Sequence, residues 1–287
     1  MGGLSGPPGT RGGRRGPVAA ADDDVTTEPE LIYEVAEGVA LIRLNRPRQL
    51  GAFTWPMIEA WARALRAAQE DDRVRAVVLT GTGRGFCTGV DLKALEEIEP
   101  TPIARKRMLT DRVHRVARAV EDLDKPLIAA VNGLAVGAGM DMALMCDMRF
   151  AARSARFSEG YIRIGLVPGD GGAYFLPRLV GPAKAMELLM TGDFIDAEEA
   201  LRLGIVNRVY DDEALLNETM AFAREIAAKP PIAISMIKRA VYQSMRTDLR
   251  TSLDLISSHM AVVQSTADYE EAMNAFREKR PGRYLNR

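Results

Sequence analysis

One stretch, residues 131–147, constrains the fold more than any other, because it connects a buried strand to a helix through small residues. The apolar residues 126–131 have the character of a strand, and Asn132-Gly133 ends them in a tight turn. A cluster of small residues at 137–139 then opens a segment rich in Met, Ala and Leu. The pattern predicts a strand, a turn and a helix, with glycines that let the backbone approach a ligand closely.

The start of this predicted helix is a candidate site for a negatively charged oxygen. The first N–H groups of a helix have no partner within the helix, and the helix dipole adds positive charge there. Asp141 lies three positions after Ala138, so the two share a helix face. The stretch therefore predicts a polarising N–H and a carboxylate in one element, although a glycine-packed turn with a solvated Asp141 explains it equally well.

Overall composition excludes several classes of function. The 287 residues carry 38 Lys and Arg against 39 Asp and Glu, so no general field draws nucleic acid or an anionic membrane to the chain. Cys87 and Cys146 fit no metal-ligand spacing and suggest no disulfide framework. We expect both to be small buried hydrophobes in a reducing, cytoplasmic compartment, with no metal site. No apolar run approaches the roughly 18 residues that span a bilayer.

The order of the predicted elements indicates an α/β fold. Strands and helices alternate over the first two thirds of the chain, which predicts a largely parallel sheet with crossover helices. The last quarter is helical, and we expect it to pack on a neighbouring subunit. Strands are predicted at residues 31–33, 39–44, 74–80, 126–131, 149–152, 156–158 and 205–209, and long helices after Thr54 and at residues 103–123, 182–190, 197–203, 212–228, 231–245, 249–264 and 268–279. Residues 1–28, rich in Gly, Pro and Arg, are predicted to be a disordered tail.

Five motifs occur in a fixed order along residues 31–280, and together they resemble the enoyl-CoA hydratase/isomerase, or crotonase, family. The motifs are Asn45-Arg46-Pro47, the loop of residues 86–93 (FCTGVDLK), the run of residues 126–133 (PLIAAVNG), Gly137-Ala138-Gly139, and the segment of residues 188–192 (LLMTG). The resemblance implies a spiral of ββα repeats over residues 29–215. It also implies a helical oligomerisation segment at residues 216–287, which forms a homotrimer or a dimer of trimers.

The resemblance also implies an acyl-CoA substrate, coenzyme A being part of that substrate, and no separate cofactor or metal. The shared device of the family is an oxyanion hole of two backbone N–H groups, which by motif position are those of Val90 and Ala138. Such donors stabilise the charge that develops on a thioester oxygen. Matching basic and aromatic positions imply contacts to coenzyme A by Arg48, Arg84, Lys93, Phe276 and Lys279, the last two toward a neighbouring subunit.

This chain departs from the hydratases of the family at the catalytic acids. Those enzymes use two glutamates, whose positions here are Asp141 and Tyr161, so the pair is incomplete. A small shift of the loop would bring Glu159 into the second position. Asp170, in the sequence Pro168-Gly169-Asp170-Gly171, faces the acyl pocket in the family. We therefore predict an acid/base set of Asp141, Tyr161 and Asp170.

The leading hypothesis is an enzyme that hydrates or isomerises an enoyl-CoA, in fatty acid or related acyl-CoA degradation. Asp141 or Asp170 moves the proton, and isomerisation tolerates the loss of one glutamate better than hydration does. A C–C bond or thioester hydrolase, similar to the β-diketone hydrolases of the same fold, is a second hypothesis, and a non-catalytic scaffold is a third. His114 and His259 show no partner in the sequence and are expected to be surface or cap residues.

Overall fold

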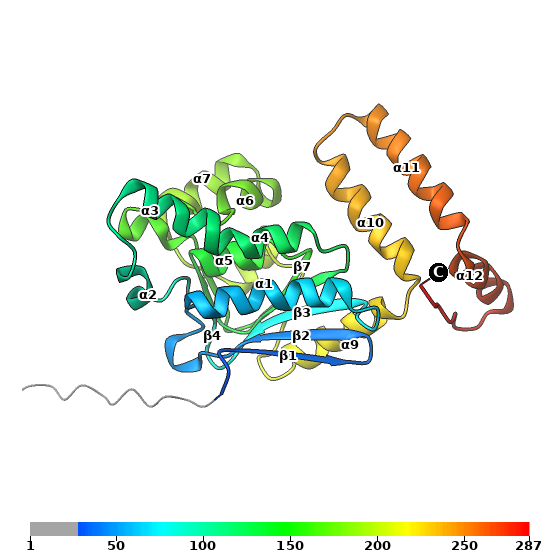
Figure 1. Cartoon of the computed structure of the whole chain (residues 1–287), viewed down its shortest axis with the longest axis horizontal. Coiled ribbons are helices and arrows are strands. Elements are labelled where there is room, and N and C mark those ends of the chain that lie inside the picture. Colours follow the sequence, from blue (N-terminus) through cyan, green and yellow to red (C-terminus); the bar gives the residue numbers. More distant parts are fainter. Residues whose placement is uncertain (1–27, 287) are drawn as a thin grey trace, which may run out of the picture.

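The fold is built on two β-sheets, which the computed structural model describes together with the rest of residues 28–286 (Figure 1). The predicted tail lies almost entirely outside the described residues. In the larger sheet only the β1–β2 pair is antiparallel, and in the smaller sheet only the β8–β9 pair is. The larger sheet has the order β1 (Leu31–Ala36), β2 (Val39–Leu44), β3 (Ala76–Gly81), β5 (Leu127–Val131), β7 (Met148–Ala152), β10 (Arg208–Tyr210), and the smaller one β4 (Gly85–Cys87), β6 (Leu134–Val136), β8 (Arg156–Ser158), β9 (Ile195–Asp196).

Successive strands enter the two sheets alternately, which is the arrangement of a ββα spiral. Strands β3, β5 and β7 belong to the larger sheet, and β4, β6 and β8, each next in the chain, belong to the smaller one. The predicted α/β fold is therefore confirmed. One detail was wrong: the turn at Asn132-Gly133 leads into β6 before the helix begins, because three residues suffice to pair with β4 and β8.

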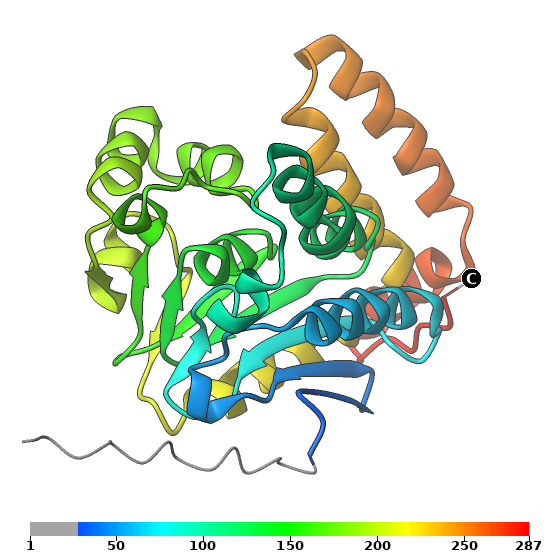
Figure 2. The same ribbon diagram turned by 60° about the vertical axis from the view of Figure 1, so that its left-hand side comes forward.

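Helices cover both faces of the larger sheet (Figures 1 and 2). Thr54 caps the first helix, accepting a hydrogen bond of 3.2 Å from Met57 N, as its sequence position predicts. Trp61 on this helix is fully buried in the core. The helices are α1 (Trp55–Glu70), α2 (Leu92–Glu96), α3 (Pro102–Arg107), α4 (His114–Glu121), α5 (Ala138–Leu144), α6 (Gly172–Val180), α7 (Pro182–Thr191), α8 (Ala197–Arg202), α9 (Leu215–Ala227), α10 (Pro231–Ser244), α11 (Leu249–Gln264) and α12 (Ala267–Glu278).

Asn132 connects the two sheets at the edge where the candidate site lies. Its Oδ1 accepts from Gly81 N at 2.9 Å, and its Nδ2 donates to Gly83 O at 2.8 Å and Gly85 O at 3.2 Å. One side chain thus satisfies three backbone groups of the β3–β4 connection. This fixes the loop that leads to the first predicted oxyanion donor.

The strand predicted at residues 205–209 is shorter and later than expected. Ile205 and Val206 are buried, but they belong to the turn after α8, where the N–H groups of both bond to Ala200 O. Pairing with β7 begins only at Arg208. The two apolar residues were mistaken for strand residues because burial in a turn and burial in a short strand give the same local pattern.

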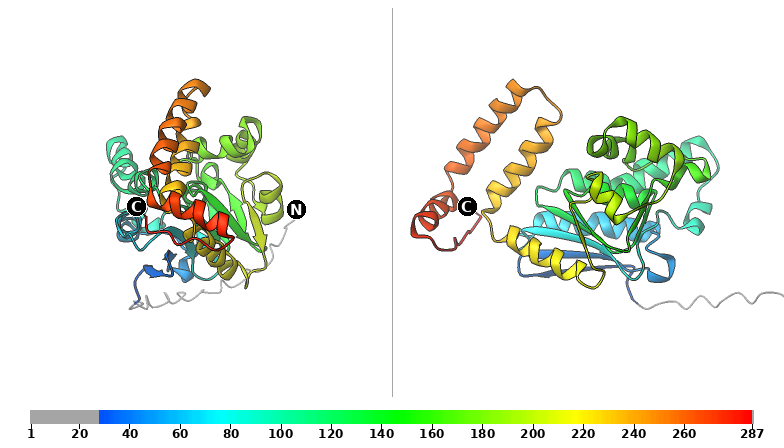
Figure 3. Two further views of the ribbon diagram at one scale, coloured as in Figure 1. Left: turned by 90° about the vertical axis from the view of Figure 1, so that its right-hand side faces the viewer. Right: turned by 180° about the vertical axis from the view of Figure 1, so that it is seen from behind.

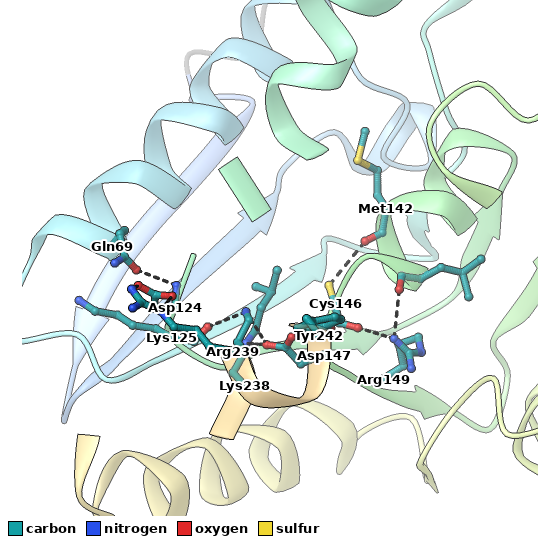
Figure 4. Close-up of polar contacts among 12 residues, drawn as sticks. Gln69, Asp124, Lys125, Met142, Cys146, Asp147, Arg149, Lys238, Arg239 and Tyr242 are labelled. Carbon is teal, nitrogen blue, oxygen red and sulfur yellow. Dashed lines mark hydrogen bonds and ion pairs between the residues drawn. The ribbon is translucent and has the colours of Figure 1, made fainter. Parts of the chain in front are cut away.

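The C-terminal helices leave the sheets after α9, which itself covers one face of the larger sheet (Figures 1 and 3). Helix α10 is anchored to the core through Asp147, which follows α5 (Figure 4). Its two carboxylate oxygens accept hydrogen bonds from Leu127 N at 2.7 Å and Tyr242 Oη at 2.8 Å, and Lys238 Nζ lies 2.8 Å away. Within the described residues, no helix is long and apolar enough to cross a membrane.

Candidate active site

The start of α5 has the backbone geometry that the glycine cluster predicts. Gly137 has φ of +53°, a left-handed value that favours glycine, and Ala138 is the first helical residue. A Cβ at Gly139 would overlap the carbonyl oxygen of Cys87. Because Gly139 has no Cβ, the first turn of α5 packs directly against the end of β4 and the loop that follows it. The free N–H groups of this turn therefore lie beside that loop.

The same loop carries Val90, the other predicted oxyanion donor. Phe53 forms a parallel bridge to Val90, in which Phe53 N donates to Gly89 O at 2.8 Å and Asp91 N donates to Phe53 O at 2.9 Å. In such a bridge the N–H of Val90 points away from Phe53. A Cβ built on Gly89 would lie 3.7 Å from Ala138 N, so the two predicted donors lie on adjacent stretches of backbone.

Arg46 holds this loop in place, a role that the Asn-Arg-Pro motif did not reveal from the sequence. Its Nη1 donates to Asp91 Oδ2 at 2.8 Å and to Ala52 O at 2.6 Å, and its Nε lies 3.0 Å from Glu30 Oε1. Burial opposes ionisation of Asp91, but the bonds from Arg46 and from Lys93 N hold the pKa of Asp91 below its usual range. Arg46 therefore fixes the residue that follows Val90.

The structure brings the predicted acid/base residues Asp141, Tyr161 and Asp170 into one cluster. Tyr161 Oη lies 2.7 Å from Asp141 Oδ2 and 3.0 Å from Asp170 Oδ2, and Asp170 N donates to Asp141 Oδ2 at 3.0 Å. The ring of Tyr161 lies against Gly137, 3.7 Å from where a Cβ would be. The cluster therefore adjoins the residue before the Ala138 donor. The tyrosine has one hydroxyl hydrogen, so both short contacts are hydrogen bonds only when one aspartate carries a proton.

Burial controls the protonation of this cluster. It raises the pKa of Asp170 to about 6, with a further contribution from the charge of Asp141. Burial also raises the pKa of Asp141, against the hydrogen bond from Tyr161. The pKa of Tyr161 is raised by burial and by the neighbouring carboxylates, which keeps its hydroxyl protonated. Asp170 is thus a carboxyl group that changes charge near neutral pH.

Glu159 lies in the cluster as well, but it approaches Asp141 from the other side. A Cβ at Gly172, the first residue of α6, would overlap Asp141 Oδ1 and lie 2.9 Å from both Glu159 oxygens. Asp141 uses its other oxygen for Tyr161 and Asp170. Burial and the charge of Asp141 raise the pKa of Glu159 to about 10, so it is protonated at neutral pH. Glu159 therefore does not restore a pair of ionised carboxylates.

His114 was expected to be a surface or cap residue, and the structure corrects this by placing it, partly buried, beside Asp170. Its Nε2 lies 2.8 Å from Gly169 O, which makes Nε2 the donor, and 3.9 Å from Asp170 Oδ1. The partner residues are more than fifty positions away along the chain, so no local pattern indicates the contact. Within the described residues, no group of three or more His, Cys, Asp or Glu side chains is arranged to hold a metal ion.

The residues predicted to contact coenzyme A fall into two places. Arg48, in the 3-10 turn Pro47–Gln49, Arg84, just before β4, and Lys93, in α2, are all exposed. The first two segments lie close together, since a Cβ at Gly83 would lie 3.1 Å from Pro47 Cβ. Phe276 is 82% exposed and lies with Lys279 at the end of α12, which is on the other side of the molecule from α2 and β4 in Figure 1. A single chain does not bring the two groups together.

Comparison with known proteins gives the same assignment along nearly the whole chain. Residues 34–287 match the enoyl-CoA hydratase/isomerase family. The chain is 37% identical to the 1,2-epoxyphenylacetyl-CoA isomerase of Escherichia coli K12, a match that covers 90% of this chain and 98% of that protein. It is 34% identical to the crotonyl-CoA hydratase of Syntrophomonas wolfei, again over 90% and 98% of the two chains.

Solved structures agree with these sequence matches. The enoyl-CoA hydratase of Bacillus anthracis superposes with a TM-score of 0.85 at 34% identity, covering 90% of this chain and all of that one. An enoyl-CoA hydratase of Mycobacterium smegmatis gives a TM-score of 0.84 at 36% identity, over 89% and 99% of the two chains. The chain therefore belongs to the enoyl-CoA hydratase/isomerase family, as its five ordered motifs predicted.

Proposed function

We propose that the protein moves the double bond of an enoyl-CoA, converting a 3-enoyl-CoA to a 2-enoyl-CoA through an enolate. The observation that carries this proposal is the Tyr161 bridge between Asp141 and Asp170, which stands where a hydratase of the family has its second glutamate. Burial and the charge of Asp141 raise the pKa of Asp170 to about 6, against the hydrogen bond from Tyr161, so Asp170 can act as a base near neutral pH. A relative in Escherichia coli is likewise named as an isomerase of a CoA thioester, although its substrate, 1,2-epoxyphenylacetyl-CoA, is an epoxide.

In the proposed reaction the thioester oxygen is bound by the N–H groups of Val90 and Ala138. Asp170 removes a proton from C2, and the electrons of that C–H bond form a dienolate whose charge rests on the thioester oxygen. The same carboxyl then returns a proton to C4, which leaves the double bond between C2 and C3. A base with a pKa near the working pH is suited to both steps. Tyr161 and Asp141 hold Asp170 in position by hydrogen bonds.

Hydration requires a second group to position and activate water, and the site offers poor candidates for it. Tyr161 stays protonated and already contacts both aspartates. Glu159 is protonated and lies on the far side of Asp141. These features support one-base isomerisation over water addition, although most of the similar proteins are named as hydratases.

A product assay in deuterated water tests the proposal. The purified protein is incubated with a medium-chain trans-3-enoyl-CoA and, separately, with crotonyl-CoA, and the products are identified by mass spectrometry. We expect the 3-enoyl-CoA to become a 2-enoyl-CoA without gain of water, and crotonyl-CoA to be hydrated far more slowly. Faster hydration than isomerisation would overturn the assignment, and release of free CoA would favour a hydrolase.

N-acetylcysteamine thioesters in the same assay test whether Arg48, Arg84 and Lys93 recognise coenzyme A, since these analogues lack its phosphates.

We also propose that the chain assembles into a homotrimer or a dimer of trimers. Support comes from apolar side chains that the single chain leaves exposed on α10 and α11, among them Ile237 at 61%, Leu249 at 74% and Leu253 at 55%. Exposed apolar surface of this extent is costly in water and is typical of an interface. Light scattering on the purified protein measures the mass directly, and a monomer at micromolar concentration would contradict the proposal.

A further inference from the structure

On one side, the buried acid cluster borders His114, a side chain that is partly exposed to solvent. Asp170 Oδ1 is buried and has no hydrogen-bond partner among the described residues, and it lies 3.9 Å from His114 Nε2. The side chain of Asp170 is 4% exposed, whereas that of His114 is 32% exposed. The imidazole therefore stands between a carboxyl that water barely reaches and a region that water does reach.

A local change of helix geometry places the side chain of His114 beside Asp170. The helix predicted over residues 103–123 is interrupted by a π-helix at Met108–Val113, and His114 N bonds to Leu109 O, five residues back. Leu109 itself lies against the turn before Asp170, 3.5 Å from where a Cβ of Gly169 would be. The wider turn changes the helix register just before His114, and such insertions are frequent at functional sites.

The region beyond His114 is a cavity of about 1150 Å³ between the core and α10. His114, Gly169 and Asp170 line it together with charged side chains that include Glu121 and Arg246. A cavity of this size holds water beside the charged side chains that line it, although apolar residues line it as well. Neither predicted oxyanion donor is among the residues that line it.

We propose that His114 passes protons between Asp170 and the water of this cavity. After Asp170 has taken a proton from the substrate, it gives that proton to Nε2 of the imidazole that carries its hydrogen on Nδ1. The resulting imidazolium releases the Nδ1 hydrogen to cavity water. The neutral ring then carries hydrogen on Nε2 and donates it to Gly169 O, the state that the structure describes. Asp170 is then ionised, and the Nε2 hydrogen exchanges with cavity water. When Nδ1 takes up a solvent proton, the imidazolium forms again and gives the exchanged Nε2 hydrogen to Asp170. This restores the imidazole with hydrogen on Nδ1 and leaves the number of protons at the site unchanged.

This inference rests on the proposed role of Asp170 as the base, and it predicts how a substrate hydrogen exchanges with solvent. In deuterated water the 2-enoyl-CoA product gains deuterium at C4 only if Asp170 exchanges its proton before returning it. His114→Gln keeps an N–H donor for Gly169 O but cannot carry a proton onward. We expect the ratio of C4 deuteration to isomerisation to fall on the order of tenfold, less than a group in direct proton transfer contributes.

Controls separate a proton path from a structural role. His259→Gln, the same change on α11, is expected to leave the ratio unchanged. His114→Ala opens space beside the cavity, and added imidazole is expected to restore exchange. An unchanged ratio in His114→Gln, or no rescue by imidazole, overturns the relay.

A second assay makes failure of the relay distinguishable from failure of the proposed reaction. Exchange of the α-hydrogens of a saturated acyl-CoA with deuterated water needs the base and the oxyanion hole but no double bond. If the wild type exchanges these hydrogens without isomerising enoyl-CoA, the proposed function fails while His114→Gln still tests the relay. If it exchanges neither, Asp170 passes no protons from bound substrate and the relay is wrong.

Discussion

Replacing Ala138 with proline is expected to lower kcat by a factor of about 100 to 1000, the usual cost of losing one oxyanion donor. Ala138 is the first residue of α5, a position where proline fits a helix because its N–H has no partner within the helix. The substitution therefore removes the proposed donor, and its ring occupies the place of the thioester oxygen. The measurement is kcat for isomerisation, together with circular dichroism to show that α5 and the fold persist.

The matched control is Ala138→Gly, which changes the same side chain but keeps the N–H. Ala138 is buried, so loss of its methyl group costs some stability but leaves the proposed donor in place. We expect Ala138→Gly to keep most of the activity. A folded Ala138→Pro protein with kcat close to that of Ala138→Gly would show that the oxyanion is bound elsewhere.

Replacing Asp170 with asparagine is expected to reduce kcat by a factor of about 100 to 10,000, the range for loss of a general acid/base group. In the wild type, activity requires the ionised carboxylate, so kcat/KM is expected to rise as the pH increases through about 6 and then to level off. Asparagine does not titrate, and its residual activity is expected to lack this rise. The measurement is the pH dependence of kcat/KM for both proteins.

Loss of activity in Asp170→Asn is not expected to come from unfolding. The pKa of Asp170 in the folded state, about 6, is above the ordinary value of 3.8. Its contribution to stability is therefore fully present below pH 3.8 and is lost as the pH rises through 6. A neutral asparagine escapes this loss, so the variant should unfold at no lower temperature than the wild type at pH 8. Asp193→Asn, an exposed position, serves as the control, and an Asp170→Asn enzyme as active as this control would exclude Asp170 as the base.

The parts of the fold that the sequence predicted are those set by local patterns. Thr54 followed by Pro56 marks a helix start from two adjacent residues, and β-branched runs mark the strands of the larger sheet. The strands β4, β6 and β9 and the true start of β10 were missed, since elements of two or three residues are too short to show a period. Pairing with distant strands, which local sequence does not report, decides such short elements.

The candidate site also has parts that the sequence predicted and parts that it did not. The resemblance placed Asp141, Tyr161 and Asp170, and the structure brings these three together. It did not indicate His114 or the protonation of Glu159, because both depend on contacts between segments far apart in the chain. The π-helix before His114 shows this well, since the sequence of the region reads as an uninterrupted helix.

Gly172 has a consequence for how this protein can change over evolutionary time. A Cβ at Gly172 would overlap Asp141 Oδ1 and crowd Glu159. A substitution at one of these three positions therefore affects the other two. In Gly172→Ala the carboxyl groups of Asp141 and Glu159 would have to move to make room for the methyl group. The Tyr161 ring packs on Gly137, where a φ of +53° disfavours any residue other than glycine, so this contact is constrained as well.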